Sequence, residues 1–387
     1  MTSVSSVSIF GIGRLGLCMG LCLERAGFKV TGVDNNADYV LKINNKTLIS
    51  YEPRVEDYIK QSSNFQATTS INKGLENSLI FIVVPTPNGG GDRFYDHSIL
   101  SNLLEQFSNL NVKNKHLVIC CTVMPGYIDN IGREIIKNCE GCTLSYHPEF
   151  IAQGDIINGY THPDFVLIGE GSAEAGDMIE YVSRRVTCNN PSIKRMTPLE
   201  AEITKISVNG FITTKIAYAN LIGDTCTEYG VNPDVVLDAI GSDSRIGNKY
   251  LKYGYSYGGP CFPRDTMALS QAIESVGLRP RIVKSVQKCN NDHIEYQAEC
   301  QLEYQLDELQ LEYQVDKRQT DCQVRNYKFT DVCYKEKCTV PIIEHSAKLK
   351  IAHILAKKGY NVVISDRSHV IKEVVKEYGN IFQYEII

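Results

Sequence analysis

The sequence has 387 residues, of which 43% are hydrophobic and 22% charged, a composition typical of a globular protein with two or three domains. The formal net charge of −5, without any long Lys/Arg block, argues against a broad surface for nucleic acid or an anionic membrane. No apolar run approaches the ~20 residues that span a bilayer, and residues 1–10 lack the pattern of a signal peptide, so we expect a cytoplasmic protein.

The 14 cysteines are scattered along a chain without a recognisable secretion signal, so we expect reduced thiols rather than disulfides. Only Cys139 and Cys142 form a CxxC pair. A zinc site needs about four ligands, and no second pair or nearby histidine completes this one. We therefore expect both cysteines to be structural, and no metal site.

The first half of the chain alternates apolar β-type runs with helical patterns. A β-rich run at 4–10 leads into GIGRLG at 11–16, and the helical pattern that follows ends at Gly27. The predicted strands after it lie at 29–34, 78–85, 116–123, 142–148 and 164–170. This βαβ rhythm predicts an α/β fold with a doubly wound parallel sheet, in a domain that covers 1–195.

Residues 196–230 carry one long amphipathic pattern, which predicts a helix of the kind that links domains or builds a dimer interface. We place it in a central helical domain, 196–290, which also contains the GGPCFPRD motif described below.

A Glu-Tyr-Gln triplet recurs at 295–297, 303–305 and 312–314. Spacings of eight and nine residues are too short for a solenoid repeat, so we expect a long, partly exposed helix. A strand near 329, a helix over 346–359 and a strand at 360–366 then predict a second, smaller Rossmann-like unit within a C-terminal domain at 291–387.

The glycines of GIGRLG predict a dinucleotide site. Gly11, Gly13 and Gly16 lie between a strand and a helix, where glycines let backbone amides approach a pyrophosphate. Asp34 lies 21 residues beyond Gly13, at the end of the next strand. Its carboxylate can accept from ribose hydroxyls and would repel a 2′-phosphate, which favours NAD over NADP in a Rossmann domain. The alternative is a tight turn without a ligand.

The stretch GGPCFPRD at 258–265 places Cys261 behind two glycines and between two prolines. A thiol beside a nicotinamide has a role in aldehyde oxidation: the thiolate adds to the aldehyde, hydride leaves, and water releases the acid. The alternative is that Cys261 is buried filler.

Six segments extend this interpretation, in a fixed order and spacing. They are VVPTP (83–87), CTVMPG (121–126), YHPEFIAQG (146–154), EITKISVNGF (202–211), DSRIGNKYL (243–251) and YGGPCFPRDT (257–266). In these segments the chain resembles the UDP-glucose/GDP-mannose dehydrogenase family of nucleotide-sugar 6-dehydrogenases, over about residues 7–290. The resemblance implies an NAD-dependent homodimer that oxidises UDP-glucose twice at C6, giving UDP-glucuronate for polysaccharide or glycan synthesis.

The resemblance implies catalytic roles for four residues near the cysteine. Cys261 would capture the aldehyde, and Lys205 and Asn209, one helical turn apart, would stabilise negative charge on the C6 oxygen. Asp265 would orient the lysine and the water. Taken alone, Lys205 and Asn209 could equally be a solvated pair on an exposed helix face.

Further site residues come from the same resemblance. Glu149 would assist hydrolysis, although it could instead cap the turn after Pro148, and Thr122 would help to hold the water. The implied cofactor contacts are Gly11, Gly13, Arg14, Leu15, Gly16, Asp34, Thr86 and Thr122.

The implied substrate contacts are Glu149, Phe150, Lys205, Asn209, Arg245, Tyr250, Tyr257, Gly258 and Lys335. Arg245 and Lys335 suit a diphosphate, and each could alternatively be an ordinary surface cation.

Three features depart from the family pattern. Gln153 replaces a glutamate, Arg264 replaces a lysine, and the segment after Lys335 lacks an Asp-x-Arg-x-Ser run, with the chain ending before an expected last strand and helix. These departures leave alternatives open. The chain could act on UDP-N-acetylmannosamine, UDP-N-acetylglucosamine or GDP-mannose, or be a non-catalytic NAD or nucleotide-sugar binding module. A simple β-hydroxyacid dehydrogenase would share the glycine turn but would have no use for Cys261.

Overall fold

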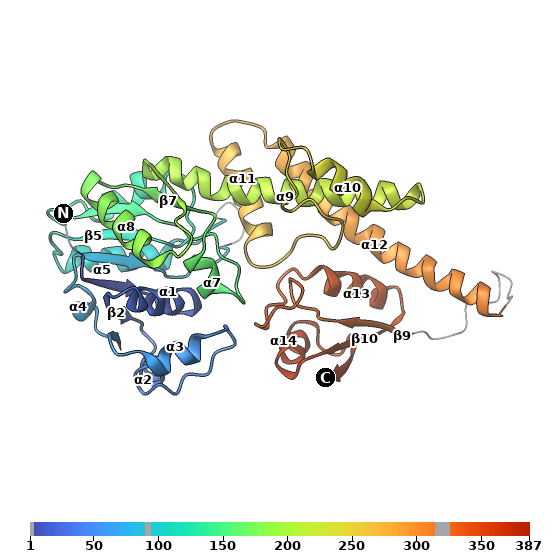
Figure 1. Ribbon diagram of the computed structural model, residues 1–387, viewed down its shortest axis with the longest axis horizontal. Helices are drawn as coiled ribbons and strands as arrows, with labels where there is room; N and C mark the ends of the chain where they lie inside the picture. Colours follow the sequence, from blue (N-terminus) through green and yellow to red (C-terminus); the bar gives the residue numbers. More distant parts are fainter. Residues whose placement is uncertain (1–3, 90–93, 314–325) are drawn as a thin grey trace. The chain divides into compact units, whose positions relative to one another are not determined.

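A computed structural model describes residues 4–89, 94–313 and 326–387 (Figure 1). The chain forms two compact units, Met1–Lys205 and Ile206–Ile387, called unit 1 and unit 2 below. The domain boundaries expected near 195 and 290 stay predictions. None of the described helices is both long and apolar enough to cross a membrane.

Unit 1 is built on an eight-stranded sheet in the order β3-β2-β1-β4-β5-β6-β7-β8. The strands are β1 (Ser6–Phe10), β2 (Lys29–Val33), β3 (Phe65–Thr68), β4 (Leu79–Ile82), β5 (His116–Ile119), β6 (Thr143–Tyr146), β7 (Phe165–Gly169) and β8 (Ser192–Met196). The predicted doubly wound fold is confirmed, with one difference: β6 and β7 meet through a single antiparallel pair, Tyr146 with Gly169.

Helices cover both faces of this sheet, as Figure 1 shows. One face packs on α1 (Arg14–Arg25), α2 (Ala37–Asn44), α3 (Val55–Gln61), α7 (Ile156–Thr161) and α8 (Ala173–Val186). The other packs on α4 (Ile71–Gly74), α5 (Ser98–Asn109), η1 (Ile128–Gly132) and α6 (Arg133–Ile135). Strand β4 explains why the sheet needs both layers. All four of its residues are buried, with Leu79 and Phe81 in one core and Ile80 and Ile82 in the other.

The strand order reverses between β1 and β4. In an open α/β sheet, ligands bind beyond the carboxyl ends of the two strands at such a reversal. The glycine turn follows β1, and the segment that contains Thr86 follows β4. The fold therefore brings two of the predicted cofactor segments to the place where the topology expects a ligand.

Unit 2 contains most of α9 (Pro198–Glu228), together with α10 (Pro233–Gly241), α11 (Phe262–Ser275) and α12 (Arg281–Tyr313). The predicted long helix at 196–230 is confirmed by α9. The first two Glu-Tyr-Gln triplets lie within α12, as expected for a long helix, whereas the third ends at Gln314, outside the described residues.

The end of unit 2 is a small α/β region. Its parallel sheet has the order β11-β10-β9, formed by β9 (Asn326–Thr330), β10 (Asn361–Asp366) and β11 (Gln383–Ile386). Helix α13 (Ala347–Lys357) connects β9 to β10, and α14 (Ser368–Tyr378) connects β10 to β11. The second, smaller Rossmann-like unit is therefore confirmed.

Candidate active site

The glycine turn has the geometry that a dinucleotide site requires. Gly11 has a φ of +87°, and a Cβ added to Gly16 would lie 2.0 Å from the carbonyl oxygen of Gly11. A Cβ added to Gly13 would meet no atom within 4 Å, so open space lies in front of this residue where α1 begins. Two glycines therefore shape the turn, and the third leaves room for a pyrophosphate at the helix N-terminus.

Other predicted cofactor residues flank the turn. Asp34 follows β2, and its carboxylate accepts a hydrogen bond of 3.0 Å from the backbone of Asn36. The Arg14 guanidinium donates to the Oε1 atom of Gln153 at 3.0 Å. The glutamine that departs from the family pattern thus lies beside the glycine turn.

Thr86 and Thr122 lie at the carboxyl ends of neighbouring strands, β4 and β5. The Thr86 hydroxyl donates to the backbone oxygen of Thr122 at 2.8 Å. Sequence reasoning named both threonines from separate segments, and the fold brings them into direct contact.

Lys205 is held against the segment that follows β6. Its Nζ atom donates to the backbone oxygen of Glu149 at 2.7 Å and lies 4.3 Å from the ring centroid of Phe150. Lys205 is 5% exposed and Asn209 is 7% exposed, so the alternative of a solvated pair is wrong. Burial raises the pKa of Glu149, while the nearby His147 and Lys205 lower it in part.

Unit 2 contains a buried polar group of its own. The Asn209 amide donates to the Asp265 carboxylate at 2.6 Å. The hydroxyl of Thr213, one turn after Asn209, lies 3.1 Å from that of Thr266, the residue after Asp265. Cys261 occupies the N-cap of α11, where the helix dipole stabilises negative charge such as that of a thiolate.

The loop before Cys261 is fixed by its neighbours. Asn290 on α12 accepts a hydrogen bond from the Tyr257 backbone N–H at 2.9 Å and donates to the Tyr257 carbonyl at 3.2 Å. A Cβ added to Gly258 would lie 2.1 Å from the backbone oxygen of His345. Gly259 has a φ of +82° and donates to the backbone oxygen of Glu344 at 2.9 Å. The glycines are therefore needed for close packing against residues 344–345.

Three of the remaining substrate candidates lie near this loop. The Tyr250 ring is 6.3 Å from that of Phe262, and Tyr257 is buried, which raises its pKa to about 12. Lys335 follows Tyr334, whose ring packs against Gly259. Arg245, by contrast, pairs with Asp243 at 2.6 Å, and 86% of its side chain is exposed.

Sequence reasoning missed a buried carboxyl group, that of Glu202. Its two oxygens accept hydrogen bonds from the backbone N–H groups of Gly126 (2.6 Å) and Ile128 (2.9 Å), and burial raises its pKa to about 7. These bonds hold the turn after Thr122 against the same helix that carries Lys205. The available signal was its position three residues before Lys205 in EITK. Sequence reasoning also missed Asn290 and His147.

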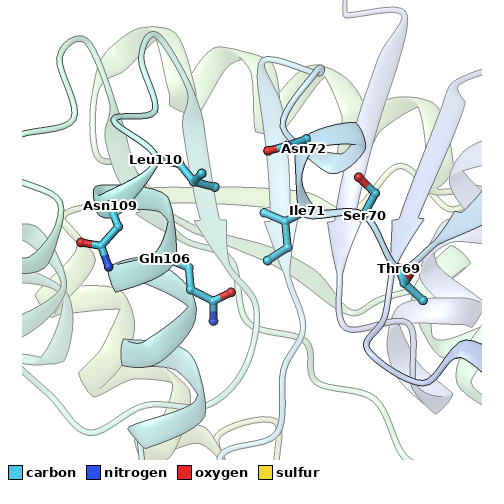
Figure 2. A pocket seen from close by; sticks show the side chains of 7 residues that line it. All are labelled: Thr69, Ser70, Ile71, Asn72, Gln106, Asn109 and Leu110. Atoms are coloured by element: carbon cyan, nitrogen blue, oxygen red, sulfur yellow. The ribbon is translucent and has the colours of Figure 1, made fainter.

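The pocket in Figure 2, with a volume of about 460 Å³, lies between the start of α4 and the end of α5. Its lining residues are Thr69, Ser70, Ile71, Asn72, Gln106, Asn109 and Leu110. They include no predicted site residue, so this pocket does not mark the predicted chemistry.

The two cysteines of the CxxC pair, Cys139 and Cys142, pack in a hydrophobic core of unit 1. Cys139 is buried, and the Cys142 thiol donates to the Val112 carbonyl at 3.5 Å. Within residues 4–89, 94–313 and 326–387, no group of three or more His, Cys, Asp or Glu side chains could hold a metal ion. None of the thirteen cysteines described there forms a disulfide.

The glycine turn, its place at the strand-order reversal and Asp34 define unit 1 as a dinucleotide-binding domain of the dehydrogenase type. Residues 5–187 match the NAD-binding domain of the UDP-glucose/GDP-mannose dehydrogenase family, and residues 199–292 match its central domain. The chain therefore belongs to this family of NAD-dependent nucleotide-sugar dehydrogenases.

Individual relatives agree. The chain is 30% identical over 294 residues to the UDP-glucose 6-dehydrogenase of Rickettsia conorii, an alignment that covers 74% of this chain and 66% of that protein. It is 28% identical to the GDP-mannose 6-dehydrogenase of Pseudomonas aeruginosa, over 75% of this chain and 70% of that protein. The aligned part thus spans slightly less than two thirds of the Rickettsia protein.

A solved structure shows the same fold. A UDP-glucose dehydrogenase from Pyrobaculum islandicum superposes with a TM-score of 0.85 and 24% identity, covering 99% of this chain and 86% of the other.

Proposed function

We propose that the protein oxidises UDP-glucose to UDP-glucuronate in two NAD-dependent steps at C6. The family and the similarity to UDP-glucose 6-dehydrogenases support this reaction. One observation carries the chemistry. Cys261 caps α11 one turn before Asp265, and Asp265 binds Asn209, which lies on α9 one turn after Lys205.

Each residue has a defined task in the first oxidation. Bound NAD supplies the hydride acceptor. Lys205 and Asn209 donate hydrogen bonds to the C6 oxygen and stabilise the negative charge that develops as its proton leaves. Asp265 holds the Asn209 amide in place by their 2.6 Å hydrogen bond.

The second oxidation passes through the cysteine. The Cys261 thiolate adds to the aldehyde carbon, and the C6 oxygen takes a proton, giving a thiohemiacetal. A second NAD would supply the acceptor for the hydride, and that proton would pass to solvent, which leaves a thioester. Water then attacks the carbonyl carbon while Glu149 accepts a water proton, and the C–S bond breaks to release the acid and regenerate the thiolate. Thr122 helps to hold the water.

The sugar nucleotide would lie against the Cys261 loop, with Tyr250, Tyr257, Gly258 and Lys335 as contacts. The family match over residues 199–292 supports this assignment for the contacts up to Gly258, and packing of Gly258 against the His345 carbonyl fixes the backbone of the loop. One relative acts on GDP-mannose by name, so a panel of nucleotide sugars is needed to test the choice of sugar and base.

We also propose a homodimer formed through α9. Five large apolar side chains on this helix are exposed, and three of them lie in unit 2: Phe211 (67%), Tyr218 (49%) and Leu221 (51%). Spacings of seven and three residues put them on one side of a helix, which is the pattern of an interface rather than of scattered surface residues. Sedimentation should give twice the chain mass of 43.3 kDa.

The decisive experiment counts the NADH formed per UDP-glucose consumed by purified protein. Two NADH per sugar, lost in Cys261→Ser but retained in Cys188→Ser at an exposed site, supports the two-step mechanism. Two NADH per sugar at full rate in Cys261→Ser would contradict the cysteine mechanism. Activity only with another nucleotide sugar would change the substrate. NAD binding without turnover on any of them would indicate a binding module.

A further inference from the structure

His147 follows β6 and faces Glu149 across Pro148. His147 is 5% exposed, and its Nδ1 atom lies 2.8 Å from the backbone oxygen of Leu167. A carbonyl oxygen can only accept, so Nδ1 carries a hydrogen. This contact fixes the ring so that its other nitrogen, Nε2, lies 3.6 Å from the Oε1 atom of Glu149.

The facing carboxylate oxygen is buried as well. Among the described residues, Oε1 of Glu149 has no hydrogen-bond partner. In neutral His147 with the hydrogen on Nδ1, the Nε2 atom presents a lone pair, and an ionised carboxylate presents only lone pairs. Two such atoms repel each other in a buried site, so the pair is stable when one proton lies on either partner.

The thiols and the phenol that surround Glu149 do not exchange this proton near neutral pH. Four other titratable groups interact electrostatically with Glu149: Lys205 on α9, Tyr160 on α7, Cys120 after β5 and Cys22 on α1. Burial raises the pKa of Tyr160 and of Cys120 well above their ordinary values, and that of Cys22 to about 12, so all three stay protonated and uncharged near neutral pH. Lys205 and a protonated His147 are then the cations that face the carboxyl group.

We propose that His147 and Glu149 share one proton, and that His147 is a positioning residue which keeps Glu149 able to accept a proton during thioester hydrolysis. This inference rests on the proposed function. When His147 holds the shared proton, Glu149 is a carboxylate and takes the proton of the attacking water. The C–S bond then breaks, and the pair returns one proton to solvent. Without His147, only Lys205 would offset the effect of burial, so Glu149 would keep its proton to higher pH and would not act as the base at low pH.

The first test needs no turnover. Infrared titration follows the C=O band of a protonated carboxyl group, which Glu149→Gln assigns to Glu149. In His147→Asn the band should persist to higher pH than in the wild type, because the imidazolium that lowers the pKa of Glu149 is lost. Asparagine keeps a donor for the Leu167 carbonyl, and His147→Gln is a second replacement should the first fail to fold. An unchanged titration in a folded variant overturns the proposal.

The second test follows hydrolysis. Two NADH form before the thioester is hydrolysed, so steady turnover after the burst reports the hydrolytic step. In His147→Asn the acid limb of this turnover should move to higher pH, with a loss at low pH within the ~10²–10⁴-fold range of general-base catalysis and recovery at high pH. His116→Asn, in the first residue of β5, should leave the limb in place.

A loss of equal size at every pH in His147→Asn would indicate a merely structural role and overturn the proposal. If no nucleotide sugar gives NADH, the proposed function fails, while the infrared titration still decides whether the pair shares a proton.

Discussion

The two units hold their predicted catalytic groups in different ways. In unit 1, Lys205 on α9 binds a backbone oxygen of the segment after β6, and the glycine turn after β1 is shaped by main-chain packing. The buried Glu202, also on α9, likewise binds backbone atoms. Unit 2 uses hydrogen bonds between side chains of different helices, as in the Asn209–Asp265 contact.

The two units also differ in the surroundings of their buried carboxyl groups, Asp265 in unit 2 and Glu149 in unit 1. The Asp265 carboxyl group accepts a hydrogen bond of 2.6 Å from the Asn209 amide, which ties α11 to α9. Glu149 has a buried oxygen without a hydrogen-bond partner among the described residues, and burial raises its pKa. One carboxyl group is therefore suited to hold its neighbours in place, and the other to give and take a proton.

The largest expected effects separate these two roles. Glu149→Gln should retain a burst of two NADH per subunit and then slow steady turnover by about 10²–10⁴-fold, because only hydrolysis needs the base. Asp265→Asn should slow the burst itself by a similar factor, because the Asn209 amide loses its anionic partner. Stopped-flow absorbance of NADH measures both phases. If the two variants slow the same phase, the division of roles is wrong.

Substitutions in the glycine turn test how far the stability of unit 1 depends on close packing of its backbone. Gly16→Ala should lower the free energy of unfolding by more than about 3 kcal/mol, because its Cβ would lie 2.0 Å from a backbone oxygen that cannot move aside. Gly13→Ala is the matched control, since its Cβ meets open space. It should change stability by less than about 0.5 kcal/mol yet weaken NAD binding at least about tenfold.

Denaturant unfolding and NAD titration of both glycine variants make this test. Equal stability losses would mean that the close packing at Gly16 is not what shapes the turn.

Glu202 offers a pH test of a carboxyl group held by backbone donors alone. Its pKa rises from 4.5 in a model compound to about 7 on folding, so the folded state binds the extra proton between these values. The stabilisation by this proton is present at the acid end of the window and is lost as the pH rises through 7. The free energy of unfolding falls by roughly 3 kcal/mol at most over this range.

Urea unfolding at pH 5 and pH 8 should therefore show a smaller decrease with pH in Glu202→Gln than in the wild type. Glu200→Gln, at an exposed position of the same helix, is the control. If the free energy of unfolding falls equally steeply with pH in Glu202→Gln and in the wild type, Glu202 does not titrate in this range.

The smallest effect concerns the departure at residue 153. Gln153→Glu would turn the exposed hydrogen bond to Arg14 into a surface ion pair, which contributes between 0 and about 1 kcal/mol. NAD affinity and turnover should therefore change less than about fivefold, and any gain should weaken with added salt. A much larger gain in hydrolysis would assign residue 153 to the water chemistry instead.

The sequence predicted those parts of the fold that bury continuous apolar runs. The inner strands β1 and β4 to β7 were found because a central strand of a parallel sheet is covered on both faces. Strands β3 and β8 were missed because they lie at the sheet edges, where FQAT and SIKRM are largely unburied and carry no apolar run.

The sequence also predicted only part of the candidate site. Motif spacing named Lys205, Asn209 and Asp265, but it could not show that Asn209 binds Asp265, since 56 residues separate them. The roles of Glu202 and His147 depend on burial and on contacts with distant backbone atoms. These follow from tertiary packing and have no local pattern.

The packing of Gly258 and Gly259 against residues 344–345 has a consequence for protein engineering. Because the backbone before the nucleophile rests on the C-terminal α/β region, this region cannot be exchanged as an independent cassette. A chimaera that takes residues 326–387 from a relative to alter substrate choice would also replace the surface under Cys261. Both sides of the contact need to come from one parent.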